Sequence, residues 1–191
     1  KIKKAVKLFL YINLILGAAA ILCALSQLYL TYQIGTNVSA KHTFFTVFTW
    51  EQKVAVAQMI AFLITAIVFL MWVYRAHANM QNFTKENTKY TPRWAIAWYF
   101  IPIAHLWKPA EAMTYLWQNS LNPEEPKQEK AGLVSVWWIS WILWYIMSNV
   151  TGLLSGQANI YTLSNVSQMR PHLYANIATV PLLFVATLCL I

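Results

Sequence analysis

Long apolar runs, separated by short polar segments, dominate the pattern of hydrophobic and polar positions along the chain. Four runs are long enough to cross a bilayer, and they cover residues 7–32, 54–75, 131–155 and 173–191. A helix rises about 1.5 Å per residue, so roughly 20 residues cross the hydrocarbon core. The pattern therefore predicts an all-α integral membrane bundle of about four transmembrane helices, which form a single transmembrane domain over residues 1–191.

A fifth apolar segment, Trp94–Trp107, lies between the second and third runs. It is too short to span a bilayer and Pro102 interrupts it, so it suits an interfacial or re-entrant element. Pro109 can begin a helix that follows, and Glu111 then falls in its favourable first turn. We therefore predict an amphipathic or re-entrant element over 91–120, lying on the cytoplasmic membrane surface or against the bundle.

The basic residues predict an orientation. Eleven of the 14 lysines and arginines lie at or before Lys7, the first residue of the first run, or from Arg75, the last residue of the second run, to the start of the third run. Only Lys41, Lys53 and Arg170 lie in the other two connections. The positive-inside rule places both termini and the central connection in the cytoplasm. The connections 35–53 and 156–172 are then outward-facing loops, and 121–130 is a polar linker.

The amino-acid composition also indicates a protein that lies in a lipid bilayer. Hydrophobic residues make up 59% of the chain and charged residues only 10%, whereas soluble domains carry about 25% charged residues. The net charge of +8 comes from residues that flank apolar runs, which suits contact with membrane lipids and excludes a nucleic-acid binder. Cys23 and Cys189 lie inside apolar runs without metal-binding spacing, so no disulfide or metal site is predicted.

Candidate catalytic chemistry is absent from the sequence pattern. No charged residue or histidine is expected at mid-depth in the membrane, where proton relays and ion-coupled carriers place theirs. No paired nucleophile and base, phosphate-binding glycine loop or zinc-protease motif occurs. No catalytic residue is predicted, and the chain is interpreted as leaning away from an enzyme.

Two histidines, His77 and His105, lie on the predicted cytoplasmic side. They are the only candidates for cofactor binding, and haem ligation would require the surface element to fold back over the second span. Nothing in their spacing requires this, so no cofactor is predicted and haem stays an alternative.

Tryptophans and one basic residue suggest contact surfaces. Trp137, Trp141 and Trp144 form one helical stripe, which indicates packing and interfacial anchoring. The alternative is a wall for a flat lipophilic ligand such as a quinone or a lipid tail. Arg75 and Asn79 share a helix face. Arg75 is either a basic stop signal or a partner for Glu111 or a lipid phosphate.

A composite motif covers the chain from Phe69 to Trp117. Its residues are Leu70, Trp72, Tyr74, Arg75, Ala76, Asn79, Thr91, Pro92, Trp94, Ala95, Trp98, Phe100, Ile101, Pro102, Ile103, Leu106, Trp107, Pro109, Ala112, Met113, Leu116 and Trp117, continued by Trp137, Trp138 and Trp141. This region resembles the bacterial membrane proteins grouped as domain of unknown function 4328. His105 departs from the pattern, because we expect asparagine there. The resemblance implies a multi-pass bacterial membrane protein, and it carries no activity.

We interpret the chain as an accessory or scaffold subunit of a bacterial inner-membrane complex, either homo-oligomeric or part of a larger assembly. The interaction motif would comprise Arg75, Asn79, Pro92, Trp94, Trp98, Pro102, Trp107, Pro109, Glu111, Trp117, Trp137 and Trp141. The first alternative is a small oligomeric transporter or channel. The second is a redox protein that binds haem or a quinone.

Overall fold

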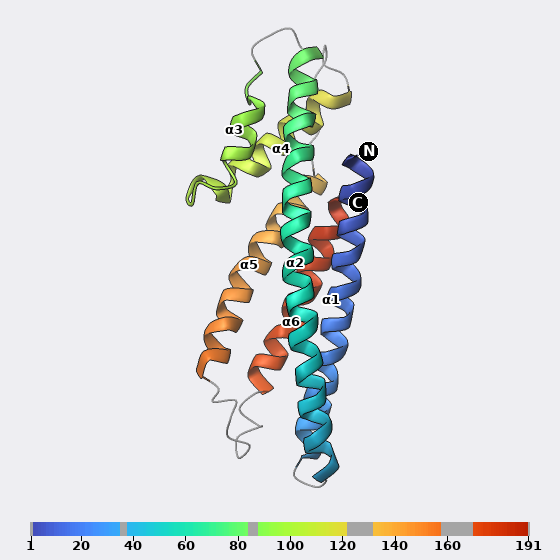
Figure 1. Ribbon diagram of the computed structural model, residues 1–191. Coiled ribbons are helices and arrows are strands. Elements are labelled where there is room, and N and C mark those ends of the chain that lie inside the picture. The colour runs from blue at the N-terminus through green and yellow to red at the C-terminus, as the bar shows by residue number, and fades with distance from the viewer. Residues whose placement is uncertain (1, 35–37, 84–87, 122–131, 158–169, 191) are drawn as a thin grey trace.

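The computed structural model describes residues 2–34, 38–83, 88–121, 132–157 and 170–190, and its regular structure in these ranges is helical. The elements are α1 (Ile2–Gln33), α2 (Val38–Phe83), α3 (Pro92–Ala97), the 3₁₀ turn η1 (Ala104–Leu106), α4 (Lys108–Leu121), α5 (Gly132–Gln157) and α6 (Arg170–Leu190) (Figure 1). Four helices, α1, α2, α5 and α6, are long and apolar enough to cross a membrane. The predicted all-α membrane fold is confirmed.

Helix α2 is much longer than predicted. It has 46 residues, a length of about 69 Å, and it includes residues 38–53, which we expected to form an outward-facing loop. The serine and threonine content suggested a loop, but the hydroxyls of Thr43, Thr46 and Thr49 each donate to the carbonyl four residues earlier. With these groups satisfied within the helix and no glycine or proline present, nothing interrupts α2.

The first two helices form a hairpin that runs beyond the ends of α5 and α6 (Figure 1). Leu30, Ala40 and Phe44 form a small buried cluster in this extension. Helix α1 also packs on α6, where a Cβ added at Gly17 would lie 3.0 Å from the Phe184 ring. Glycine therefore permits the close approach of α1 and α6, as small residues do between membrane helices.

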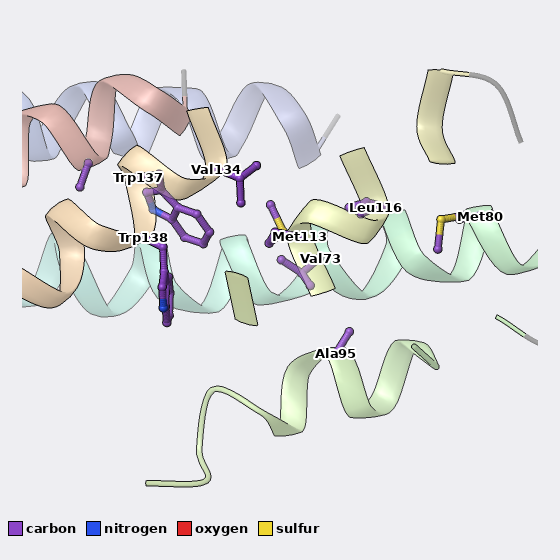
Figure 2. Packing of buried hydrophobic residues seen from close by; sticks show 9 residues of the cluster. Val73, Met80, Ala95, Met113, Leu116, Val134, Trp137 and Trp138 are labelled. Carbon is purple, nitrogen blue, oxygen red and sulfur yellow. The ribbon is translucent and has the colours of Figure 1, made fainter. Parts of the chain in front are cut away.

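The opposite end of the molecule holds the N-terminus of α1 together with α3 and α4, and we call it the basic end. Helix α2 continues past Arg75, where we expected it to end, and α3 and α4 lie against this continuation (Figure 1). Figure 2 shows Met113 of α4 between Val134 of α5 and Val73 of α2. The predicted surface element thus packs against the spanning helices through a buried apolar face.

The segments 122–131 and 158–169 lie outside the described residues. They include nearly all of the polar linker and most of the second outward-facing loop that the sequence predicts.

Candidate functional site

A cavity of about 340 Å³ lies among the spanning helices, and we call it the central cavity. All four spanning helices, the segment between α3 and η1, and η1 itself contribute to its lining. The residues are Leu10, Asn13, Phe62, Thr65, Ala66, Phe69, Leu70, Tyr99, Phe100, His105, Trp137, Trp138, Trp141, Leu183, Ala186, Thr187 and Leu190. The cavity is therefore bounded mainly by apolar and aromatic side chains.

Aromatic rings of α5 form one wall of the central cavity. Trp138 and Trp141 are stacked with ring centroids 5.0 Å apart, and Tyr145 continues the stack at 6.0 Å from Trp141. Trp137 and Trp141 of the predicted stripe line this cavity, whereas Trp144 packs against Phe62 of α2. Trp138 was not in the predicted stripe, although its spacing of three residues from Trp141 is a helical neighbour spacing.

The turn η1 is fixed over this aromatic wall. The indole Nε1 of Trp138 donates to the carbonyl oxygen of Leu106 at 2.7 Å. The imidazole of His105 makes edge contacts with Trp138, Trp141 and Tyr145, at centroid distances of 6.1, 5.5 and 6.3 Å. The fifth apolar segment of the sequence thus closes one side of the central cavity.

Few polar groups reach the cavity. Asn13 Nδ2 donates to Thr65 Oγ1 at 2.7 Å, which joins α1 to α2, and Thr187 donates to the Leu183 carbonyl. The Tyr99 hydroxyl is buried and has no hydrogen-bond partner among the described residues. Burial raises the pKa of Tyr99, so this hydroxyl stays protonated.

The two candidate histidines do not share a cavity. His77 is 0% exposed, and its Nδ1 lies 3.0 Å from the Val73 carbonyl oxygen within α2. His105 lines the central cavity, whereas His77 lines neither this cavity nor the two hollows described below. Within the described residues, no group of three or more metal-binding side chains occurs.

Glu111 lies in the first turn of α4, as predicted, but its partners are lysines rather than Arg75. Its two carboxylate oxygens bind Lys89 Nζ at 2.7 Å and Lys108 Nζ at 2.8 Å. Hydrogen bonds from Lys108 and then Lys89 lower the pKa of Glu111 to about 2. Arg75 lies within α2 and is exposed.

The remaining motif residues build α3 and its contacts. Thr91 caps the N-terminus of α3, with Pro92 following in the first turn. The rings of Trp94 and Trp98 lie 5.0 Å apart, and Lys108 Nζ lies 5.8 Å from the Trp98 ring centroid. Pro109 is fully buried, Trp94, Trp107 and Trp117 are about half exposed, and Pro102 and Asn79 are exposed. These motif residues are therefore spread over α3, α4 and the cavity wall rather than gathered in one site.

Two further hollows lie at the basic end. The end cavity has a volume of about 530 Å³, and its lining comprises Lys3, Trp72, Ala76, Asn79, Met80, Met113, Leu116, Trp117, Asn119, Ser120, Leu133, Val134, Trp137, Cys189 and Leu190. The neck is a smaller hollow of about 70 Å³, lined by Lys3, Val6, Lys7, Phe69, Trp72 and Leu190. Both combine an apolar floor with basic or amide side chains.

Comparison with known proteins gives one match. The family described as domain of unknown function (DUF4328) matches residues 39–191, which is well over half of the chain and includes the motif from Phe69 to Trp117. No curated protein and no solved structure matches the chain significantly.

Proposed function

The chain belongs to the family of the domain of unknown function DUF4328, and it is a membrane protein of unknown activity. We propose that this protein binds an apolar molecule from the bilayer in its central cavity. The observation that carries this proposal is the aromatic cavity lined by the four helices that are long and apolar enough to cross a membrane. Its volume of about 340 Å³ lies within the usual range for small-molecule sites, which are also mostly apolar with few polar groups.

The contact between α2 and α5 supports entry from the lipid. The α1–α2 and α5–α6 pairs pack closely along their backbones, whereas α2 and α5 meet mainly through side chains. The contacts include Phe62 with Trp144 and Phe69 with Trp137, at centroid distances of 6.3 and 5.9 Å. Ring rotation changes such a contact without moving a helix, so an apolar molecule reaches the cavity from the membrane interior.

Filling the cavity tests this proposal. Ala66 of α2 lines the central cavity, so Ala66→Phe places a ring in the space that the ligand needs. Ala57→Phe adds the same ring at an exposed position of the same helix. We expect native mass spectrometry of the purified wild-type protein to show an apolar adduct that survives delipidating detergent. Ala66→Phe should reduce its occupancy at least about tenfold, a loss of roughly 1.4 kcal/mol.

The control variant Ala57→Phe should keep the adduct. A wild-type protein without any adduct, or an Ala66→Phe variant with undiminished adduct, would contradict the proposal.

An accessory role in a membrane complex is the second candidate. It is supported by the exposed apolar side chains between α3 and α4, among which Phe100 is 69% and Ile103 is 72% exposed. A surface of this kind suits the apolar helix of a partner subunit or the lipid interface. The same native mass spectrum distinguishes these occupants, because a partner subunit appears as an additional protein mass in fixed stoichiometry. A spectrum without such a protein mass would count against the accessory role.

A further inference from the structure

The central cavity, the neck and the end cavity adjoin one another in a series. The central cavity and the neck share Phe69 and Leu190, and the neck and the end cavity share Lys3, Trp72 and Leu190. If the shared side chains of Phe69, Trp72 and Leu190 move aside, a single elongated molecule extends from the basic end into the middle of the spanning helices.

The length of this series matches one lipid leaflet. Lys3 lines the neck and Asn13 lines the central cavity, and both lie on α1. Ten residues of helix separate them, a distance of about 15 Å. The hydrocarbon core of a bilayer is about 30 Å thick, so one leaflet accounts for about 15 Å. The series therefore accommodates a hydrocarbon chain of ordinary lipid length.

The charge at the basic end favours the binding of an anion. Lys3 and Lys7 are four residues apart and thus lie on one face of α1, where both line the neck. None of the described residues that line the neck or the end cavity is acidic. Amides of Asn79 and Asn119 lie along the end cavity and add polar groups near the lysines. Lysines near a membrane surface attract anionic head groups.

We propose that the occupant is an anionic phospholipid. Its phosphate lies between Lys3 and Lys7, and one of its hydrocarbon chains runs through the neck into the central cavity. This inference rests on the proposed function, because it names the class of the apolar molecule that the cavity holds. A neutral lipophile would fill the central cavity but would leave the two lysines without a counter-charge.

Matched lysine variants test the inference. Lys7 lines the neck, whereas Lys4 lies on the same turn, is exposed and lines none of the three hollows. Lys7→Gln and Lys4→Gln remove the same charge from the same segment, so any effect on membrane orientation is common to both. The probes are phosphatidylglycerol and phosphatidylcholine with identical chains, together with glycerol phosphate, each added to delipidated full-length protein and counted by native mass spectrometry.

We expect wild-type protein to bind phosphatidylglycerol at least about fivefold more tightly than phosphatidylcholine. Lys7→Gln should lose this preference and Lys4→Gln should keep it, and glycerol phosphate alone should not bind. The inference is overturned if Lys7→Gln retains the preference, if Lys4→Gln loses it equally, or if glycerol phosphate binds as tightly as the lipid.

Failure of the inference is distinguishable from failure of the proposed function. Binding of both lipids with equal affinity, still blocked by Ala66→Phe, would leave the proposed function intact and refute only the anionic ligand. Binding of neither lipid would refute the anionic phospholipid, and the proposed function would also fail only if the purified wild-type protein carried no apolar adduct.

Discussion

At the scale of single residues, Glu111 connects the start of α4 with the segment before α3. Its carboxylate binds Lys108 within α4 and Lys89, which lies 22 residues earlier. The Lys89 amide also donates to the Tyr115 hydroxyl, and the Tyr90 and Tyr115 rings are in contact at 5.6 Å. One carboxylate and two tyrosine rings therefore hold Lys89 and Tyr90, which lie just before α3, against α4.

The Glu111 cluster predicts a pH dependence of stability. The pKa of Glu111 is lowered from the ordinary 4.5 to about 2, so the folded state binds this proton less readily than the unfolded state does. The ionised Glu111 carboxylate therefore makes its full contribution to the free energy of unfolding above pH 4.5, and this contribution is lost as the pH falls toward 2. Because the Glu111 side chain is 37% exposed, we expect its ion pairs to add only about 0.5 kcal/mol to the free energy of unfolding.

The measurement is thermal unfolding of the wild-type protein and Glu111→Gln, followed by tryptophan fluorescence at several pH values. The variant should be less stable at pH 7, and its difference from wild type should vanish near pH 2. A difference that stayed constant over this pH interval would show that the ionised carboxylate is not the cause.

The sequence predicts the position of Glu111 but not its partner. Helical spacing identifies neighbours three or four residues apart, which locates Glu111 in the first turn of α4 beside Lys108. It cannot identify Lys89, because that contact depends on how the connection to α3 folds back. The pairing of Glu111 with Arg75, one of the alternatives for Arg75, is not among the ion pairs of the described residues.

At the scale of elements, the turn η1 depends on one indole. The turn has only three residues, too few to be stable alone, and its Leu106 carbonyl accepts from Trp138 Nε1 of α5. Trp138→Phe removes this hydrogen bond while keeping an aromatic ring. Loss of one such bond costs about 1 kcal/mol, so the amides of His105, Leu106 and Trp107 should exchange with deuterium about fivefold faster.

Hydrogen exchange with Trp144→Phe is the matched control. Trp144 lies on the same helix and packs against Phe62, so its replacement should leave exchange at η1 unchanged. Equal acceleration in both variants would mean that general loosening of α5, rather than the Trp138 bond, controls the turn.

The spanning helices follow from apolar run length, because a long uncharged run has no other stable structure in lipid. The length of the apolar run does not predict that residues 38–53 are helical. That segment carries Lys41, Glu51 and Lys53, and its threonines suggested a loop. Its helical structure depends on packing against α1, with Phe44 buried against Leu30, and this is a tertiary contact that local composition does not reveal.

At the scale of the whole molecule, the charge distribution predicts orientation. We propose that the basic end faces the cytoplasm of a bacterial inner membrane, because eleven of 14 basic residues lie on that side of the predicted spans. His42 and Gln81 are exposed residues near opposite ends of α2. In a background with Cys23→Ala and Cys189→Ala, a membrane-impermeant maleimide should label His42→Cys in intact bacterial cells.

The same reagent should label Gln81→Cys only after the cells are lysed. Labelling of Gln81→Cys in intact cells, with His42→Cys protected, would reverse the orientation and would place Lys3 and Lys7 in the outer leaflet.

The central cavity is a property of the whole molecule that the sequence could not reveal. Its lining comes from α1, α2, the segment between α3 and η1, η1 itself, α5 and α6. The tryptophan stripe suggested a wall for a lipophilic ligand, and Trp137 and Trp141 do line the cavity. The opposite walls depend on how far apart α2 and α5 lie, and no local pattern encodes that distance.

The length of α2 has a mechanical consequence. An uninterrupted helix of 46 residues without glycine or proline behaves as a stiff rod of about 69 Å, over twice the thickness of the hydrocarbon core. If such a rod pivots by about 5° at one end, its other end moves by about 6 Å. The extension of the α1–α2 hairpin and the helices α3 and α4 lie at opposite ends of this one helix, so a tilt of α2 displaces the elements at one end relative to those at the other.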